Sequence, residues 1–346
     1  MKFHIFSQLV INWYHIHGRK HLPWQKNKTL YKVWISEIML QQTQVNTVIP
    51  YFKNFISRFP NLKTLNNGTL DDILYLWSGL GYYKRAKNIY YTAKIIENHF
   101  NGKFPRNITD LVKLPGIGRS TAGAILSFSL DYSFSILDSN VKRILMRYYG
   151  IAQCLKNTST EKKLWNLIEN ITPLHNTGSF NQGIMDIGAL ICTPKIPKCN
   201  ICPLNLRCVS YKEKEWEKYS FQNYKKIKLK KKYWFIVIFF NNKIWMKKNT
   251  IHNIWNNLFC FPSFDKQNQA TQWLQENKID IKKCKEIKSF NHEFSHFTIQ
   301  AIPIFIKLFF RKDFLNIDKQ GIWYNLKNPQ KVGLPQLVKK ILKLLI

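Results

Sequence analysis

The segment Leu114-Pro-Gly-Ile-Gly-Arg-Ser-Thr-Ala122 joins an amphipathic stretch to a second stretch of small residues, and both have helical spacing. Its two glycines, Gly116 and Gly118, predict a tight hairpin, because glycine adopts backbone angles that other residues avoid. Such a turn lets backbone N–H groups approach an anion, and the N-terminus of the next helix adds a partial positive charge. The segment predicts a helix-hairpin-helix unit over about residues 107–128 that binds one DNA phosphate without reading base sequence. A plain corner between two helices is the alternative.

A single carboxylate, Asp138, follows the hairpin within Ile136-Leu-Asp-Ser-Asn-Val-Lys-Arg143. It ends an apolar run just before an expected helix, where aspartate more often caps a helix than catalyses a reaction. The intervening helix returns the chain towards the bound phosphate. A carboxylate held there would stabilise positive charge on a deoxyribose ring.

Four cysteines gather in the 17 residues from Cys192 to Cys208, with Cys199 and Cys202 between them. Thiolates at this density select zinc or an iron–sulfur cluster. Only Cys199 and Cys202 form the short-gap pair typical of zinc sites, so the uneven spacing favours a cluster. Four unconnected thiols are the less expected alternative. The remaining cysteines are isolated and predicted as small core hydrophobes: Cys154, Cys260 and Cys284.

The chain is strongly basic, with 53 Lys and Arg against 20 Asp and Glu and a net charge of +33. A field of this size indicates a polyanionic partner, and nucleic acid is the first candidate. Lys, Asn and Ile are abundant throughout the sequence, which indicates a coding bias, so part of the charge is expected to be solvated surface. No apolar run reaches the roughly 20 residues of a membrane span, and the first residues lack a signal-peptide pattern. Clustered metal-binding thiolates need a reducing compartment, so we expect a cytoplasmic protein.

The 346 residues divide by pattern into two unequal parts. Residues 1–212 predict an all-α core, and residues 213–232 a solvated, lysine-rich linker. Residues 233–346 predict a small α+β domain, with a hairpin at 233–246 and a strand at 297–306. Helices are expected at 31–59, 70–76, 82–99, 107–113, 118–128, 139–148, 161–171, 269–277 and 334–345.

Three further motifs accompany the hairpin, the aspartate and the cysteine loop. They are Trp34-Ile-Ser-Glu-Ile-Met-Leu-Gln-Gln-Thr-Gln44, Leu76-Trp-Ser-Gly-Leu-Gly-Tyr-Tyr83 and Phe180-Asn-Gln-Gly-Ile-Met-Asp-Ile-Gly188. In this order they resemble the helix-hairpin-helix DNA glycosylase superfamily, endonuclease III branch, and within it the MutY-type adenine glycosylases. The resemblance implies a glycosylase core followed by a Nudix-like lesion-recognition domain at 233–346. It also implies a monomeric repair enzyme of the cytoplasm and nucleoid, which hydrolyses the glycosidic bond of adenine opposite 8-oxoguanine or guanine in double-stranded DNA.

The resemblance assigns the chemistry to two carboxyls. Glu37 becomes the general acid that protonates adenine, although by pattern alone it is an exposed or salt-bridged glutamate in an apolar helix. Apolar surroundings raise a carboxyl pKa, which suits this role. Asp138 then supports the oxocarbenium-like sugar, with Asn140 orienting the groups around it.

Ser120 stands where strand-cleaving relatives carry a lysine nucleophile. A hydroxyl cannot form the Schiff base that such a lysine makes with the opened sugar. The resemblance therefore implies a monofunctional glycosylase, although the nearby Lys142 could trap a sugar adventitiously.

The resemblance also assigns substrate contacts. Gln41 and Tyr82 would enter the base stack while the target base is extruded, although a core aromatic is the alternative for Tyr82. The residues implied in binding the adenine or the DNA backbone are Arg19, Trp24, Gln182, Gln42, Thr43, Gly116 and Gly118. Cys192, Cys199, Cys202 and Cys208 become ligands of a [4Fe–4S] cluster without hydrolytic chemistry.

In the second part, Phe290-Asn-His-Glu-Phe-Ser-His-Phe297 resembles the loop that probes 8-oxoguanine, with Phe294, Ser295 and His296 as the contacts. The glutamate-rich metal motif of Nudix hydrolases is missing, which implies recognition rather than hydrolysis. Asparagines replace the relatives' glycines at Asn253, Asn256 and Asn257, and this predicts relaxed recognition of the opposite base.

Two other functions remain possible from the sequence. One is an endonuclease III-like glycosylase/lyase for oxidised pyrimidines, which Ser120 and the long second domain oppose. The other is a non-catalytic iron–sulfur DNA-binding protein, which Glu37 and Asp138 oppose.

Overall fold

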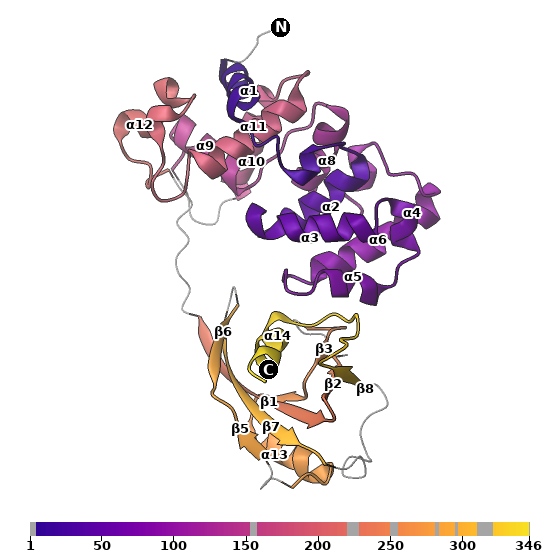
Figure 1. Cartoon of the computed structure of the whole chain (residues 1–346). Helices are drawn as coiled ribbons and strands as arrows, with labels where there is room; N and C mark the ends of the chain where they lie inside the picture. Colours follow the sequence, from indigo (N-terminus) through magenta and orange to yellow (C-terminus); the bar gives the residue numbers. More distant parts are fainter. Residues whose placement is uncertain are drawn as a thin grey trace. The chain divides into compact units, whose positions relative to one another are not determined.

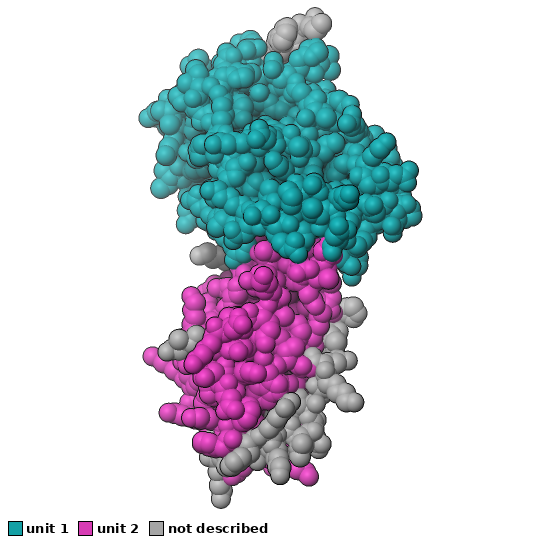
Figure 2. Space-filling view, turned by 45° about the vertical axis from the view of Figure 1, so that its right-hand side comes forward, with its two compact units in different colours: residues 1–67, 88–224 teal, residues 68–87, 225–346 magenta. Residues whose placement is uncertain are grey.

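The computed structural model describes residues 5–152, 158–219, 228–249, 255–280, 284–294, 297–309 and 321–345. The chain forms two compact units, shown in different colours in Figure 2. Unit 1 comprises residues 1–67 and 88–224, and unit 2 comprises residues 68–87 and 225–346. A short segment of the expected helical core, residues 68–87, therefore folds with the C-terminal part of the chain.

Unit 1 consists of helices joined by short loops (Figure 1). Its α-helices are α1 (Ile5–His17), α2 (Leu30–Leu40), α3 (Val45–Arg58), α4 (Leu62–Asn66), most of α6 (Lys84–Phe100), α7 (Ile108–Leu111), α8 (Arg119–Leu130), α9 (Ser139–Tyr149), α10 (Thr158–Ile171), α11 (Thr177–Leu190) and α12 (Val209–Glu213). Short 3₁₀ helices are η1 (Pro23–Gln25), η2 (Cys199–Ile201) and η3 (Asn205–Arg207). The expected all-α character of this part is confirmed.

Helices α2 and α11 form the centre of unit 1. Helix α2 is apolar on most of its faces, with Trp34, Ile35 and Met39 fully buried, and it packs against α8. Helix α11 packs against α1, α8 and α9. A Cβ at Gly188 of α11 would lie 2.6 Å from Cβ of Asn140, so the missing side chain permits the close approach of α9.

Two expected helices differ in extent from the observed ones. The stretch 31–59 is broken into α2 and α3, because Gln42 adopts a left-handed φ of 55° and turns the chain. The helix expected from Tyr82 begins at Lys84, because Tyr82 also has a left-handed φ, of 49°. A single residue with left-handed φ does not change the spacing of the apolar residues on either side. The apolar pattern therefore continues past it and does not show where the helix ends.

Unit 2 is an α+β structure built on one sheet. Its strands are β1 (Leu229–Phe240), β2 (Lys243–Lys248), β3 (Phe259–Cys260), β4 (Ser263–Phe264), β5 (Cys284–Glu286), β6 (Phe290–Glu293), β7 (Phe297–Lys307) and β8 (Gly321–Asn325). The order is β3-β2-β1-β7-β5, with β4 on β1, β6 on β7 and β8 on β2. The expected hairpin is the antiparallel pair β1–β2, turned at Asn241 and Asn242, which both have positive φ. The long central pair, β1 and β7, is parallel.

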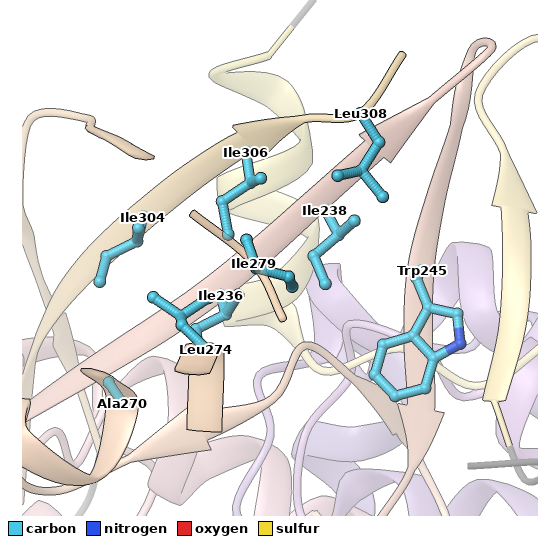
Figure 3. Close-up of a cluster of buried hydrophobic side chains, with 9 residues drawn as sticks. All are labelled: Ile236, Ile238, Trp245, Ala270, Leu274, Ile279, Ile304, Ile306 and Leu308. Carbon is cyan, nitrogen blue, oxygen red and sulfur yellow. The ribbon is translucent and has the colours of Figure 1, made fainter. Parts of the chain in front are cut away.

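Helices cover the sheet of unit 2. Helix α13 (Gln267–Glu276) buries Ala270 and Leu274 against alternate residues of the central strands, such as Ile236 and Ile306, in the cluster drawn in Figure 3. Helix α14 (Gln336–Lys343) has its own buried apolar face. The segment 68–87 contributes α5 (Leu70–Leu76) to the unit. A Cβ at Gly333 would lie 2.8 Å from Cβ of Leu74, so the C-terminal segment contacts α5 closely.

Both ends of the stretch expected as a linker, residues 213–232, have defined structure, and residues 220–227 lie outside the described residues. Strand β1 already begins at Leu229, and its first residues pair in parallel with β7, from Leu229 opposite Phe297 to Lys232 opposite Gln300. These residues are exposed, so backbone pairing and not side-chain burial makes them a strand, and the lysine run hides the pattern. At the other end, Arg147 Nε donates a hydrogen bond to the carbonyl of Trp216. No helix within the described ranges has the length and apolar character needed to cross a membrane.

Candidate active site

Gly116 and Gly118 lie in the turn that leads into α8. Gly116 has a φ of 81°, and a Cβ there would lie 2.7 Å from Asn88 Nδ2, so glycine is required on both counts. Gly118 has an extended conformation and caps the N-terminus of α8. A Cβ at Gly118 would meet no atom within 4 Å, so the space beside this helix N-terminus is open.

Glu37 and Asp138 are close enough for their charges to interact. Burial and, to a smaller extent, the negative charge of Asp138 together raise the pKa of the Glu37 carboxyl from 4.5 to about 8. Burial also raises the pKa of Asp138, although the hydrogen bonds from Val141 and Asn140 act in the opposite direction. As whole residues, Glu37 and Asp138 are half-buried, and it is the burial of their carboxyl groups that shifts both pKa values.

Asp138 is fixed by the start of α9. Its Oδ1 accepts a hydrogen bond from the backbone N–H of Val141 (2.8 Å), and its Oδ2 accepts one from Asn140 Nδ2 (3.0 Å). The helix-capping role expected from the pattern is therefore confirmed. Arg143 donates in turn to Asn140 Oδ1 (2.9 Å) and to the carbonyls of Gly188 and Cys192 (2.7 Å each). One buried guanidinium thus connects the surroundings of Asp138 with the cysteine loop.

Ser120 and Lys142 are both engaged in hydrogen bonds or ion pairs. Ser120 Oγ accepts from the backbone N–H of Leu137 (3.0 Å), so this hydroxyl supports the segment that leads into Asp138. Lys142 Nζ pairs with Glu161 Oε1 (2.6 Å) and is partly buried. Lys142 is thus held by an acid on α10.

Two of the three residues expected at the adenine pocket, Arg19 and Gln182, lie in one polar network. Arg19 donates to Asp186 through its backbone N (2.8 Å), Nε (2.9 Å) and Nη2 (2.7 Å). Gln182 Nε2 donates to the same carboxylate (3.1 Å), and its Oε1 accepts from Gln25 Nε2 (2.7 Å). Trp24 is buried beside Gln25 in η1. Asp186 lies inside the quoted motif 180–188, but a fully buried acid in an apolar helix gave no pattern that identified it in advance.

The turn after α2 contacts the hairpin. Gln41 Nε2 donates to the carbonyl of Gly116 (3.2 Å), and Thr43 Oγ1 donates to the carbonyl of Gln41 (3.4 Å). Gln42 is exposed. The structure therefore brings these three expected DNA contacts next to the expected phosphate site, although 75 residues separate Gln41 from Gly116.

Tyr82 lies in unit 2 and is exposed to 45%. The alternative of a core aromatic is therefore wrong. The guanidinium of Arg85 lies 5.3 Å from the Tyr82 ring. The ring is thus presented at the surface beside a cation.

The four cysteines of the loop line one cavity, together with Arg147 and Trp216. Burial raises the pKa of Cys199, Cys202 and Cys208, that of Cys202 to about 12, and the neighbouring thiols add to each shift. Arg147 Nη1 donates to Cys192 Sγ (3.4 Å). Backbone N–H groups donate to two of the sulfurs, from Leu204 to Cys202 and from Tyr211 to Cys208. Within the described ranges, no group of three or more His, Cys, Asp or Glu side chains is placed to hold a metal ion.

In the expected lesion-recognition loop, Phe294 stacks on Phe297 (ring centroids 4.7 Å apart) and meets His292 edge-on (4.8 Å). Its backbone N–H donates to the carbonyl of Phe297 (2.9 Å). Ser295, His296 and Asn253 lie outside the described residues. Asn257 has a φ of 67°, the left-handed conformation expected where asparagine replaces glycine.

Two groups of residues lie in the candidate site although no sequence pattern pointed to them. Asp186 and Gln25 share the polar network around Arg19, and Arg143 and Arg147 contact the cysteine loop. Buried arginines on an otherwise amphipathic helix indicate an internal polar network, and this is the only pattern that points to Arg143 and Arg147.

Comparisons with known proteins agree with this geometry. Residues 35–170 match the family model described as HhH-GPD superfamily base excision DNA repair protein, and residues 233–344 match the NUDIX domain model. A solved thermostable thymine-DNA glycosylase is similar over 60% of this chain and 96% of its own, with 26% identity and a TM-score of 0.55. A non-covalent endonuclease III–DNA complex shares the fold, with 20% identity, a TM-score of 0.51, and coverage of 60% of this chain and 94% of its own.

Two curated relatives are both called adenine DNA glycosylase. That of Buchnera aphidicola subsp. Schizaphis graminum is 65% identical over 345 residues, which cover 99% of each chain. That of Homo sapiens is 35% identical over 221 residues, 61% of this chain and 40% of its own. The identity to the bacterial relative extends through both units and both matched domains. The chain therefore belongs to the adenine DNA glycosylases, base-excision repair enzymes that hydrolyse N-glycosyl bonds.

Proposed function

We propose that this protein removes adenine opposite 8-oxoguanine or guanine in double-stranded DNA, as a monomer, and leaves an intact abasic strand. The observation that carries the proposal is the pair Glu37 and Asp138, two carboxyls whose charges interact and whose pKa values are both raised. Hydrolysis of a glycosidic bond needs one acid that keeps its proton and one carboxylate that supports a cationic sugar.

Glu37 is the proton donor. With its pKa raised to about 8, the carboxyl keeps a proton at neutral pH. Transfer of this proton to a ring nitrogen of adenine converts an anionic leaving group into a neutral one. The apolar helix around Glu37 disfavours the charged form, so the carboxyl keeps its proton until the adenine ring nitrogen accepts it as the bond breaks.

Asp138 supports the sugar as the bond breaks. Its two oxygens are held by Val141 and Asn140, so the carboxylate does not have to reorganise when positive charge develops. A cationic sugar beside Asp138 lowers the pKa of this carboxyl and favours its ionised form. Water then completes the hydrolysis.

The target adenine must leave the helix first, at a cost of a few kcal/mol. Gln182, Arg19 and Trp24 would receive it, and the bonds to Asp186 fix the polar groups of Gln182 and Arg19 before the base arrives. Gln41, Gln42 and Thr43 would contact the DNA beside the phosphate bound at Gly116 and Gly118, while Tyr82 would fill the gap in the stack. Lys142 would contribute only positive charge, since Glu161 already pairs with it.

A [4Fe–4S] cluster would fit the cysteine loop, because its four ligands surround a cube of iron and sulfur and need not converge on one ion, for which the described side chains are not placed. Cys192, Cys199, Cys202 and Cys208 line one cavity, and backbone N–H groups donate to two of the sulfurs, as they do in sites that tune such clusters. The cluster would supply structure and no hydrolytic chemistry. Arg143 and Arg147 tie the carbonyls of Cys192, Thr193 and Pro194 to α9, so the loop and Asp138 share one support.

In unit 2, the loop at Phe294, Ser295 and His296 would probe the base opposite the adenine. Phe294 and Phe297, which flank the two polar residues in the sequence, stack their rings on each other and are bonded through their backbones. A few polar contacts, each worth about 1–3 kcal/mol, suffice to distinguish 8-oxoguanine from guanine.

Replacing either carboxyl should stop excision while DNA binding remains. Glu37→Gln removes the proton and Asp138→Asn removes the charge, so each variant should lose at least about 100-fold in single-turnover excision of adenine opposite 8-oxoguanine. Glu97→Gln is the matched control, because Glu97 bonds only at the surface, to Asn66. Near-normal excision by either site variant, measured on gels beside a binding assay, contradicts the assigned roles.

The raised pKa of Glu37 also predicts a pH dependence. Excision should fall about tenfold per pH unit above pH 8, where the proton is lost. Between pH 4.5 and 8 the folded protein holds a proton that the unfolded chain releases, so wild-type stability should fall as the pH rises through this window. Glu37→Gln lacks this penalty and should be more stable than wild type by about 1–3 kcal/mol at pH 7, a difference that shrinks towards pH 5. Urea denaturation of both proteins across this range measures it, and a pH-independent difference would refute the assignment.

The product of the wild-type enzyme should break only after alkaline treatment. Ser120→Lys places an amine at the sugar and should yield some strand cleavage that borohydride traps. Ser120→Ala controls for the lost hydrogen bond to Leu137 and should give no cleavage. Efficient cleavage by wild type without alkali would instead support the lyase alternative.

The purified protein should be brown and hold about four irons per chain. Cys199→Ser should lose iron and DNA affinity together, because the loop then lacks a ligand. Cys284→Ser, a change outside the loop, should keep both. Stoichiometric zinc without iron, in protein purified without air, would contradict this assignment.

A further inference from the structure

The turn that carries Tyr82 is bonded to the C-terminal end of the chain, inside unit 2. Ser78 Oγ donates to the carbonyl of Leu334 (2.7 Å) and accepts from its backbone N–H (3.0 Å). Tyr83 Oη donates to the same carbonyl (2.9 Å), and Lys339 Nζ donates to the carbonyl of Ser78 (2.7 Å). Ser78, Tyr83 and Leu334 are buried, so the bonds are shielded from water. Residues 256 positions apart therefore form one polar cluster.

The backbone of this turn has an unusual conformation. Gly79, Gly81 and Tyr82 have φ values of 106°, 81° and 49°. A left-handed conformation is uncommon for tyrosine and persists where surrounding contacts determine it. Trp77 Nε1 and Arg85 Nη2 both donate to the carbonyl of Gly81, at 3.0 and 3.2 Å. The turn is thus fixed both by hydrogen bonds from its sequence neighbours Trp77 and Arg85 and by hydrogen bonds with the C-terminal segment.

Neighbouring tyrosines have opposite environments. Tyr83 is 8% exposed and bonded to Leu334, whereas the ring of Tyr82 is exposed. Because the two residues share a peptide bond, fixing Tyr83 also fixes the backbone from which Tyr82 projects. The C-terminal segment also packs closely on α5, which precedes this turn, since a Cβ at Gly333 would lie 2.8 Å from Cβ of Leu74.

We propose that residues 333–339, which we name the C-terminal clamp, hold Tyr82 in the orientation that enters the base stack. Ser78 and Tyr83 are then positioning residues for base extrusion. This inference rests on the proposed function, which gives Tyr82 its place in the DNA. It adds a second task to the C-terminal part of the chain, separate from probing the opposite base.

The test removes single hydrogen bonds of the clamp in the full-length protein. Tyr83→Phe and Ser78→Ala each delete a hydroxyl that bonds Leu334. Tyr31→Phe and Ser7→Ala are matched controls in unit 1, where Tyr31 donates to the carbonyl of Phe59 (2.7 Å) and Ser7 to that of Ile171. The probe is a duplex with adenine opposite 8-oxoguanine and 2-aminopurine beside the adenine, whose fluorescence rises when stacking is lost.

Both clamp variants should give a smaller and slower fluorescence rise than wild type, and single-turnover excision should fall about tenfold with the Kd for DNA within about threefold. The two controls should match wild type in both readouts, while all four variants lose similar amounts of melting temperature. In a Tyr82→Ala background, Tyr83→Phe should cause no further loss, because the ring that it positions is already gone.

Clamp variants that match their controls in fluorescence and excision would overturn the inference. So would an undiminished effect of Tyr83→Phe in the Tyr82→Ala background, since the loss would then not pass through Tyr82. Failure of wild type to release adenine would instead refute the proposed function. The two failures are therefore distinguishable in one set of measurements.

Discussion

The arrangement of the site depends on the hydrogen bonds at the N-terminal end of α9. Asp138 caps this helix, and Arg143, one turn further along, donates to Asn140 and to the carbonyls of Gly188 and Cys192. Leaving such buried carbonyls without a partner costs about 1–3 kcal/mol each. Because α9 also packs against α11 at Gly188, the same few bonds fix the carboxylate, the neighbouring helix and the start of the cysteine loop.

The second constraint is the burial of Glu37. A carboxyl with a pKa near 8 destabilises the fold at neutral pH, because the unfolded chain is free to ionise it. Helix α2 compensates with large apolar side chains that are fully buried, such as Trp34 and Met39. The same apolar surroundings that hold α2 in place therefore keep the proton on Glu37. One environment thus determines both the stability of the fold around α2 and the pKa of the Glu37 carboxyl.

The division into two units does not follow the order of the residues along the chain. Residues 68–87 lie between helices of unit 1 in the sequence, yet they pack with the sheet and C-terminal helix of unit 2. Lys248 pairs with Asp71 of α5, at 2.9 Å, and Lys87 bonds to Asn256. A truncation after residue 232 would thus remove the partners of α5 and of the Tyr82 turn together with the recognition loop. Point substitutions are the cleaner way to separate these contributions.

Local patterns in the sequence predicted most of the elements. The apolar period of 31–59 and 139–148, the β-branched run before Asn241 and the glycines of the hairpin each act over a few residues, where propensity and spacing decide. The motif order also assigned roles to the two carboxyls and the four cysteines, and these roles stay predictions. The tertiary structure alone decided the rest: the pKa of Glu37, the network of Arg19 with Asp186, the course of residues 68–87 and the clamp at Leu334. These features depend on contacts between residues up to 256 positions apart, and such contacts leave no periodic trace because each partner looks ordinary in its own segment.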